Sequence, residues 1–327
     1  MTERGEGPFQ DVDLPVAAPS GLHGVQRWLL RQAVKGLLPL RGCWPRYDLD
    51  PAPKPGVGGR LSLELVSHCW SYAHLLEGQL GSLIANPPAT CDVTMTVYFS
   101  REDQDTTRLL EACAEREVPN VTWSFRAAPK QRLFRRSIGR NHAASTTSAD
   151  WIWFTDCDVL FGPGCLDGLA AALAGRTDPL VFPAVEQLTE LLPDDELGAG
   201  ASQPSGDPDG PAAATPPLLH DPTANHTFVP VPVTKAKGPL QITHGDVARA
   251  VGYCRDLAAY QRPEPSFAKC HEDTAFRWLL GTHGVPVDVP AVSRIRHQAK
   301  GRYAGSATSG RVRASVRRLQ EKLRHPS

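Results

Sequence analysis

The feature that most constrains the fold is a series of strand candidates that begin about thirty residues apart, the length of a strand–helix–strand unit. Apolar or alternating segments begin near residues 61, 93, 121 and 151, with helical patterns between them. Right-handed crossovers of this kind place successive strands parallel in one sheet. The pattern predicts an α/β fold with a mostly parallel central sheet flanked by helices. The predicted strands are 61–67, 93–99, 121–125 and 151–155, and the predicted helices are 70–84, 105–117 with Asp105 as N-cap, and 132–148.

Turn-forming residues gather outside this repeat and suggest the domain boundaries. Stretches rich in Pro, Gly, Ala and Ser cannot bury enough apolar area to offset the entropy of ordering, so they predict flexible segments. The expected organisation is a leader with one amphipathic helix and a Pro/Gly-rich linker (1–59), an α/β domain (60–305) with a first half (60–185), a flexible insertion (193–234) and a second half (235–305), and a basic amphipathic C-terminal helix (306–327).

Composition and charge exclude several classes of protein. The 35 Lys and Arg residues balance the 35 Asp and Glu residues, so the net charge does not predict a nucleic-acid binder. No apolar run reaches the roughly 18 residues that span a bilayer, and the N-terminus lacks an export pattern, so a cytoplasmic protein is expected. The eight cysteines have no CxxC spacing and are expected to be free thiols.

The C-terminal part of the chain is strongly basic. From Arg294 onward there are ten Lys and Arg residues and a single acid, Glu321. Val312, Val316, Leu319 and Leu323 form one apolar stripe, with which such a helix can lie on an anionic membrane as a peripheral contact. The alternative is a terminal helix that packs its stripe on the domain while its arginines face the acidic body.

Two carboxylates follow the fourth predicted strand directly. Asp156 and Asp158 stand at i and i+2, before the apolar triplet Val159-Leu160-Phe161. Because parallel sheets bind ligands beyond the carboxyl ends of their strands, both side chains can face one cation there. Carboxylate oxygens suit Mg²⁺ or Mn²⁺, which bridge to substrate phosphates. The alternative interpretation is a solvated acidic turn.

Four segments, in order, give the chain a family resemblance. IGRNHAASTTSADWIWFTDCDVLF (138–161) resembles the nucleotide-diphospho-sugar glycosyltransferases of the GT-A fold, the family-2 type in particular. GPLQITHGDVARAVGYCRDL (238–257) and CHEDTAFRWLLGTHGVPV (270–287) are similar to that family's acceptor-side segment and its E-D motif. SRIRHQAKGRY (293–303) resembles a metal-binding region of β-1,4-galactosyltransferases. The resemblance covers roughly 61–305 and implies a GT-A (Rossmann-like) sheet.

The resemblance implies a metal site and a catalytic base. Asp158 would be the main metal ligand, with Asp156 as a weaker ligand or a ribose contact, and His297 would complete the site. The other histidines that could take the place of His297 are His244, His271 and His283. Asp273 would be the general base and Glu272 would orient acceptor or donor. The alternative for both acids is helix capping.

Further residues are implied to bind the nucleotide. Arg140 matches an arginine that reaches the nucleotide in relatives, and Ser67 ends the first strand. Glu102 and Asp103 follow the second strand, two or three residues later than the family's base-binding Asp, a departure that bears on the identity of the base.

The implied activity is metal-dependent, inverting glycosyl transfer of the hexosyltransferase type. The cofactor would be Mn²⁺ or Mg²⁺, and the donor a nucleotide-diphosphate sugar, with a UDP-sugar expected. The acceptor would be a glycan, a lipid-linked molecule or a small molecule. One rival is a non-catalytic GT-A scaffold or binding module. A sugar nucleotidyltransferase ranks lower, because SHCWSYAHL (67–75) after the first strand contains no glycine.

Overall fold

The computed structural model describes residues 7–17, 23–43, 47, 49–52, 59–193, 226–265 and 271–297. Most of its strands form one eight-stranded sheet in the order β1-β4-β3-β2-β5-β10-β7-β11. Neighbours from β1 to β5 are parallel, β10 is antiparallel to both β5 and β7, and β11 is parallel to β7. The strands are β1 (Phe9–Asp11), β2 (Leu61–His68), β3 (Cys91–Phe99), β4 (Val121–Ala127), β5 (Trp151–Phe154), β7 (Leu180–Pro183), β10 (Gln241–His244) and β11 (Val285–Val287).

A smaller four-stranded sheet lies beside the first, in the order β6-β12-β8-β9. Its strands are β6 (Val159–Phe161), β8 (Val185–Leu192), β9 (Val229–Pro232) and β12 (Val292–His297). The segment between β5 and β6 contains both Asp156 and Asp158, so the acidic pair connects the two sheets.

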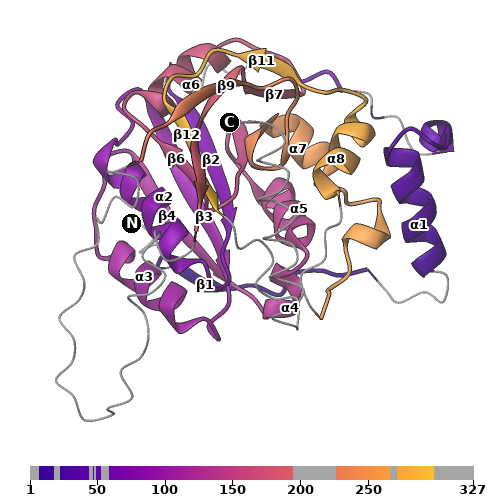
Figure 1. Cartoon of the computed structure of the whole chain (residues 1–327), viewed down its shortest axis with the longest axis horizontal. Coiled ribbons are helices and arrows are strands. Elements are labelled where there is room, and N and C mark those ends of the chain that lie inside the picture. Colours follow the sequence, from indigo (N-terminus) through magenta and orange to yellow (C-terminus); the bar gives the residue numbers. More distant parts are fainter. Residues whose placement is uncertain are drawn as a thin grey trace, which may run out of the picture.

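Helices cover both faces of the large sheet. Figure 1 shows α2 and α3 on one side of the strands and α5, α7 and α8 on the other. The helices are α1 (His23–Val34), α2 (Ala73–Ala85), α3 (Gln104–Ala114), α4 (Lys130–Leu133), α5 (Arg136–Thr146), α6 (Cys165–Leu173), α7 (Gly245–Val251) and α8 (Glu272–Leu280), with 3₁₀ turns η1 (Leu40–Cys43), η4 (Gly238–Leu240) and η5 (Ala258–Tyr260). The predicted α/β class with a mostly parallel sheet is confirmed.

Buried apolar residues explain why the central strands form. Successive side chains of β5 are Trp151, Ile152, Trp153 and Phe154, and all four are buried, because helices pack on both faces of the sheet. Strand β2, which pairs with β5, and strand β3, which pairs with β2, are also buried along most of their length. A strand pattern without polar alternation therefore marks the centre of the sheet.

Two predictions about flexible segments differ from the structure. Residues 9–11 of the predicted leader form the edge strand β1, because the ring of Phe9 packs against Phe99 and Phe125 while the backbone pairs with β4. Within the predicted insertion (193–234), residues 229–232 form β9 and pair with β8. The remainder of that insertion, 194–225, and the predicted C-terminal helix (306–327) lie outside the described residues.

Two local predictions about helices were wrong. The N-cap of α3 is Asp103 and not Asp105, since the Asp103 side chain accepts hydrogen bonds from the backbone N–H and the hydroxyl of Thr106. The single helix predicted over 132–148 is divided into α4 and α5 at Arg135, whose backbone leaves the helical region. That break buries the Arg135 guanidinium, which pairs with Glu264.

The cysteines that the structure describes are all free thiols, as predicted: Cys43, Cys69, Cys91, Cys113, Cys157, Cys165 and Cys254. None of the described helices is long and apolar enough to cross a membrane.

Candidate active site

The acidic pair lies in a backbone turn that buried side chains hold in place. Gln79, buried on α2, donates from Nε2 to the carbonyl oxygens of Asp156 (2.9 Å) and Val159 (3.0 Å). From the opposite side of the sheet, Arg140 on α5 donates to the carbonyl oxygen of Thr155 at 3.0 Å. The turn beyond β5 is therefore fixed by both helical layers, which places the two carboxylates at the carboxyl end of the parallel strands.

Two arginines of α5 engage Asp156. Arg136 and Arg140 are four residues apart, so they lie on one face of the helix. Both pair with Asp156 Oδ1, Arg140 at 3.1 Å. Arg136 also donates from Nε to Glu272 Oε1 at 3.3 Å, and the Ser137 backbone N–H donates to Glu272 Oε2 at 3.1 Å. The structure thus joins residues far apart in sequence in one arginine cluster, consisting of Arg136, Arg140, Asp156 and Glu272.

The Glu272 carboxylate and the Arg140 guanidinium stay ionised although both are buried. Burial by itself raises the pKa of Glu272, but the positive charges of Arg136, Arg140 and Arg135 outweigh it, and the pKa lies below the ordinary value of 4.5. Burial also acts to lower the pKa of Arg140, whereas the Tyr253 oxygen and the nearby carboxylates raise it, with a net increase. Two cations and two carboxylates therefore balance each other.

Tyr253 also holds the Arg140 guanidinium. Its hydroxyl accepts from Arg140 Nη1 at 3.0 Å and donates to Gln241 Oε1 at 2.7 Å. The residue before it, Gly252, has φ of 63°, and a Cβ atom there would lie 2.3 Å from Asn141 Oδ1. The Gly-Tyr pair of the second half is thus needed for close packing against α5.

Asp158 lies beside His297. His297 Nε2 lies 3.9 Å from Asp158 Oδ2, and both side chains are buried. The backbone N–H of Ile295 donates to the carbonyl oxygen of Asp158 at 2.9 Å, which fixes β12 beside the acidic turn. His244, by contrast, lies opposite Trp151, at the other end of β5 from the acidic turn. Of these two histidines, the structure therefore brings His297 to Asp158.

The residues present suit a metal that is shared with a phosphate ligand. Within the described part of the chain, no group of three or more His, Cys, Asp or Glu side chains could hold a metal ion. Asp158 and His297 supply one carboxylate and one imidazole, and Asp156 already pairs with two arginines. Mg²⁺ and related ions often use one or two carboxylates and complete their shell with phosphates and water. Such a site fits a metal that arrives with a nucleoside diphosphate.

A second set of charges, missed by the sequence analysis, lies near Asp158. Glu186 is fully buried and pairs with Lys237 and with Arg294, whose Nε lies 3.1 Å from Glu186 Oε2. Burial raises the pKa of Glu186, but hydrogen bonds and charge from Arg294 and Lys237 outweigh it and leave the pKa lowered. The negative charge of Asp158 also acts on both cations. No sequence pattern joins these residues, which come from β8, the turn before η4, and β12.

The two acids that open α8 lie in different surroundings. The Glu272 side chain is 3% exposed and belongs to the arginine cluster, whereas the Asp273 side chain is 31% exposed. Asp273 Oδ2 lies 3.7 Å from Arg277 Nη1, and the nearest atom to a Cβ built on Gly238 is Asp273 Cβ at 3.8 Å. Asp273 is thus the accessible carboxylate of the pair.

The remaining predicted residues have other neighbours. Glu102 forms a surface ion pair with Lys130, and Asp103 caps α3 while accepting from the Ser71 N–H at 2.5 Å. Ser67 is buried at the end of β2 and its hydroxyl has no hydrogen-bond partner in the described structure. The described contacts of Glu102 and Asp103 therefore support the start of α3 and do not include the arginine cluster.

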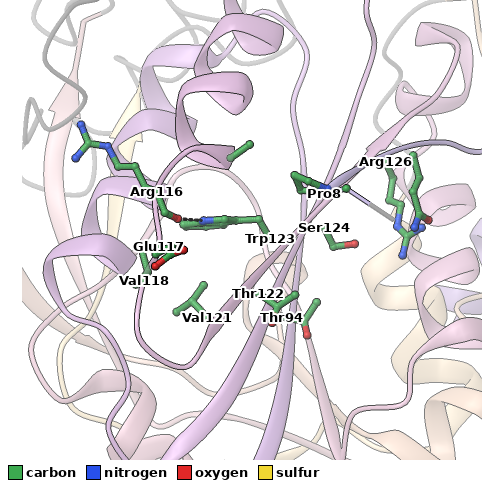
Figure 2. A pocket seen from close by; sticks show the side chains of 13 residues that line it. Pro8, Thr94, Arg116, Glu117, Val118, Val121, Thr122, Trp123, Ser124 and Arg126 are labelled. Atoms are coloured by element: carbon green, nitrogen blue, oxygen red, sulfur yellow. Dashed lines mark hydrogen bonds between the residues drawn. The ribbon is translucent and has the colours of Figure 1, made fainter. Parts of the chain in front are cut away.

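The cavity in Figure 2 lies elsewhere in the fold. It has a volume of about 600 Å³ and is bordered by Pro8, Thr94, Val121, Trp123 and Arg126. Its lining follows β4 from Val121 to Arg126 and includes Pro8, just before β1. None of the predicted site residues lines it, and it is not the candidate active site.

Comparison with known proteins gives a structural likeness alone. The chain matches no protein-family model and no characterised protein sequence. Among solved structures it is similar to the mannosyltransferase PcManGT from Pyrobaculum calidifontis in complex with GDP-Man and Mn²⁺, with 16% sequence identity and a TM-score of 0.41. That similarity covers 93% of this chain and 76% of the mannosyltransferase chain.

Proposed function

We propose that the protein is a metal-dependent, inverting glycosyltransferase of the GT-A type. It moves a sugar from a nucleotide-diphosphate donor to an acceptor hydroxyl. The observation that carries the proposal is the arginine cluster, in which Arg136 joins Asp156, after the fourth parallel strand, to Glu272, at the start of α8. The cluster unites the two acidic motifs of the family resemblance beyond the carboxyl ends of the strands, where open α/β sheets bind ligands.

Charge balance supports a metal requirement. Asp156 and Glu272 are matched by Arg136 and Arg140. In the second set, Lys237 and Arg294 pair with Glu186, and the charge of Asp158 also acts on both cations. A nucleoside diphosphate adds two or more negative charges to a site that is already neutral. Asp158 and His297 would hold Mn²⁺ or Mg²⁺, which supplies the positive charge that stabilises a diphosphate leaving group.

Asp273 is the proposed general base. Inverting transfer needs a carboxylate that accepts the proton of the attacking hydroxyl. Glu272 is committed to Arg136 and to the Ser137 N–H, whereas Asp273 is the more exposed acid beside it. Glu272 therefore fixes the start of α8, and Asp273 meets the acceptor, which would be a glycan, a lipid-linked molecule or a small molecule.

The contacts of two acids bear on the identity of the donor. Glu102 and Asp103, the acids expected to meet a uracil, pair with Lys130 and cap α3. A UDP-sugar remains the first donor to test, and the surroundings of these acids make other bases worth the same test.

One experiment tests the activity directly. The full chain is incubated with Mn²⁺ and a panel of UDP-, GDP-, dTDP- and ADP-sugars, and released nucleoside diphosphate is measured with and without chelator. Metal-dependent release from one donor class is expected. A second measurement uses thermal unfolding, in which Mn²⁺ and the nucleoside diphosphate together should raise Tm more than the sum of the two alone.

Asp158→Asn should abolish this joint effect, because the main metal ligand is lost. The matched control is Asp105→Asn, which changes an exposed acid on α3 and should leave the joint effect unchanged. If no nucleoside diphosphate binds in the presence of Mn²⁺, the transferase proposal is wrong. Binding without release or transfer for any donor would instead favour the non-catalytic scaffold.

A further inference from the structure

Helix α1 exposes an apolar stripe to solvent. Val25 is 58% exposed, Trp28 57% and Leu29 37%, and the spacing i, i+3, i+4 places all three on one face of the helix. Leu37, just after the helix, is 68% exposed. We call these four residues the α1 stripe. Large apolar side chains that gather on one surface mark an interaction site more often than scattered ones do.

A different face of α1 holds the helix on the protein. Leu30, Ala33 and Val34 are buried, and η1 continues the attachment, since Arg41 donates to the carbonyl oxygen of Leu279 at 2.7 Å. The Arg41 guanidinium also lies 5.5 Å from the ring centre of Trp278. Figure 1 shows α1 as an outer element beside α8. The α1 stripe is therefore not the face that docks the helix.

Positive charges follow the edge of the α1 stripe. Arg27 and Arg31 lie four residues apart on α1, and Lys35 follows directly after its last residue, where its N–H still donates to the Arg31 carbonyl oxygen at 3.3 Å, so the three form a row along one side. Arg27 pairs with Glu264, which leaves Arg31 and Lys35 as exposed cations of the row. From residue 14 to residue 47 the sequence contains five Lys and Arg residues and no Asp or Glu.

This charge pattern favours one kind of binding partner for the α1 stripe over two others. A second copy of α1, or the basic segment 298–327 of the same chain, would bring positive charge against positive charge. An anionic lipid surface is complementary to the cation row and accepts the apolar side chains. Tryptophan is enriched at the boundary between headgroups and acyl chains, where its amphipathic ring is stable.

We propose that α1 is an interfacial helix that binds an anionic lipid bilayer, with the α1 stripe inserted among the headgroups and the cation row facing lipid phosphates. Binding needs no ligand in the candidate active site and does not rest on the proposed function. Because α1 and η1 pack on α8, the bilayer would lie on the side of the protein that contains Asp273. If the transferase proposal also holds, this arrangement favours an acceptor attached to lipid.

Vesicle binding of the full chain tests the proposal. We compare co-sedimentation with phosphatidylglycerol-containing vesicles and with pure phosphatidylcholine vesicles, at low and high salt. The double variant Val25→Ser/Trp28→Ser should lose at least tenfold in partitioning to the anionic vesicles. Arg31→Gln/Lys35→Gln should lose roughly fivefold for each charge removed and should reduce the dependence on salt. The matched control is Val229→Ser, which removes an apolar residue that is 55% exposed on β9 and should partition like wild type.

A second measurement distinguishes binding through α1 from binding through the basic C-terminal segment, which every variant retains. Brominated lipids should quench part of the tryptophan fluorescence of the wild type, and Trp28→Phe should remove that quenched part. Unchanged sedimentation of both double variants would overturn the proposal and assign binding to another part of the chain. Failure of the wild type to bind anionic vesicles, or concentration-dependent dimerisation that Val25→Ser/Trp28→Ser abolishes, would also overturn it, the latter in favour of a second copy.

Discussion

Neighbouring residues of the same chemical type differ here in what surrounds them. Glu272 and Asp273 are consecutive, yet one is buried against Arg136 and the other is partly exposed beside Arg277. Asp156 and Asp158 are separated by one residue, and one faces two arginines while the other faces a histidine. In both pairs one acid is held by arginines of α5, and the other is the acid to which the proposed function gives a chemical role.

Asp273→Asn should lower the rate of transfer by roughly 10²- to 10⁴-fold, the usual contribution of a general base, and leave the affinity for the donor unchanged. The amide cannot accept the proton of the acceptor hydroxyl, but it has nearly the same size. Steady-state kinetics with the active donor measure both quantities. The control is Asp246→Asn, because Asp246 also lies in a first helical turn and pairs with an arginine three residues later. Transfer within a few-fold of wild type in the Asp273 variant would move the base elsewhere.

His68→Phe should flatten the pH dependence of stability in mild acid. Burial, followed by the charges of Arg140 and Arg136, lowers the pKa of His68 well below 6.5. The folded protein therefore keeps this ring neutral where the unfolded chain binds a proton, and the free energy of unfolding falls as the pH drops below 6.5. Each such proton changes it by about 1.4 kcal/mol per pH unit.

Phenylalanine preserves the stacking of His68 on Tyr98, whose ring centres are 4.9 Å apart, but does not titrate. Urea unfolding of wild type and variant at pH 8 and at several values below 6.5 measures the difference. Parallel curves across the whole range would show that the folded protein protonates His68 as readily as the unfolded chain does.

At the level of elements, close approaches between the backbones of neighbouring segments position the helices. The N–H of Gly245, at the start of α7, donates to the carbonyl oxygen of Asp150 at 2.7 Å, immediately before β5. On α5, Gly139 packs directly against His68, since a Cβ there would lie 2.2 Å from Nε2. Glycine at these two positions lets α5 and α7 lie close to the strands that precede the acidic turn.

Gly245→Ala should destabilise the fold by roughly 1–3 kcal/mol, the usual cost of overpacking. Its Cβ would lie 2.1 Å from the carbonyl oxygen of Ala149, a backbone atom that cannot rotate away. The opposite sign is expected for Gly24→Ala on α1, where no atom lies within 4 Å of a new Cβ, and where alanine should add about 0.5–1 kcal/mol of stability. Urea unfolding measures both. Equal effects of the two substitutions would contradict the close contact at α7.

At the scale of the whole molecule, the N-terminal segment supplies the outermost strand of the large sheet and covers the outer side of β4. β1 pairs in parallel with β4, and the Phe125 N–H donates to the Pro8 carbonyl oxygen at 2.7 Å. Without this strand, the outer side of β4 would present unpaired backbone groups, which are a template for association with other chains.

Phe9→Ala should lower the free energy of unfolding by roughly 1–3 kcal/mol, as expected for a partly buried aromatic side chain. Its ring centre lies 5.2 Å from that of Phe125 and 6.1 Å from that of Phe99. Faster hydrogen exchange along the outer side of β4 and some self-association should accompany the loss. The control is Val16→Ala, since Val16 is 43% exposed. A Phe9 variant with wild-type exchange along β4 would show that β1 does not depend on this ring.

The sequence by itself determined the repeating part of the fold and the position of the acidic turn. Hydrophobic periodicity is local, so it revealed β2, β3, β4 and β5, the helices between them, and Asp156 and Asp158 after the last of these strands. Tertiary structure alone decided the rest. The edge strand β1 and the antiparallel β10 depend on partners far along the chain. Arg136, Glu186, Lys237 and Arg294 acquire their roles only from oppositely charged side chains that the fold brings to them. Ion pairing acts over a few ångströms in space and leaves no period in the sequence, so no local pattern could have selected these three cations and one acid.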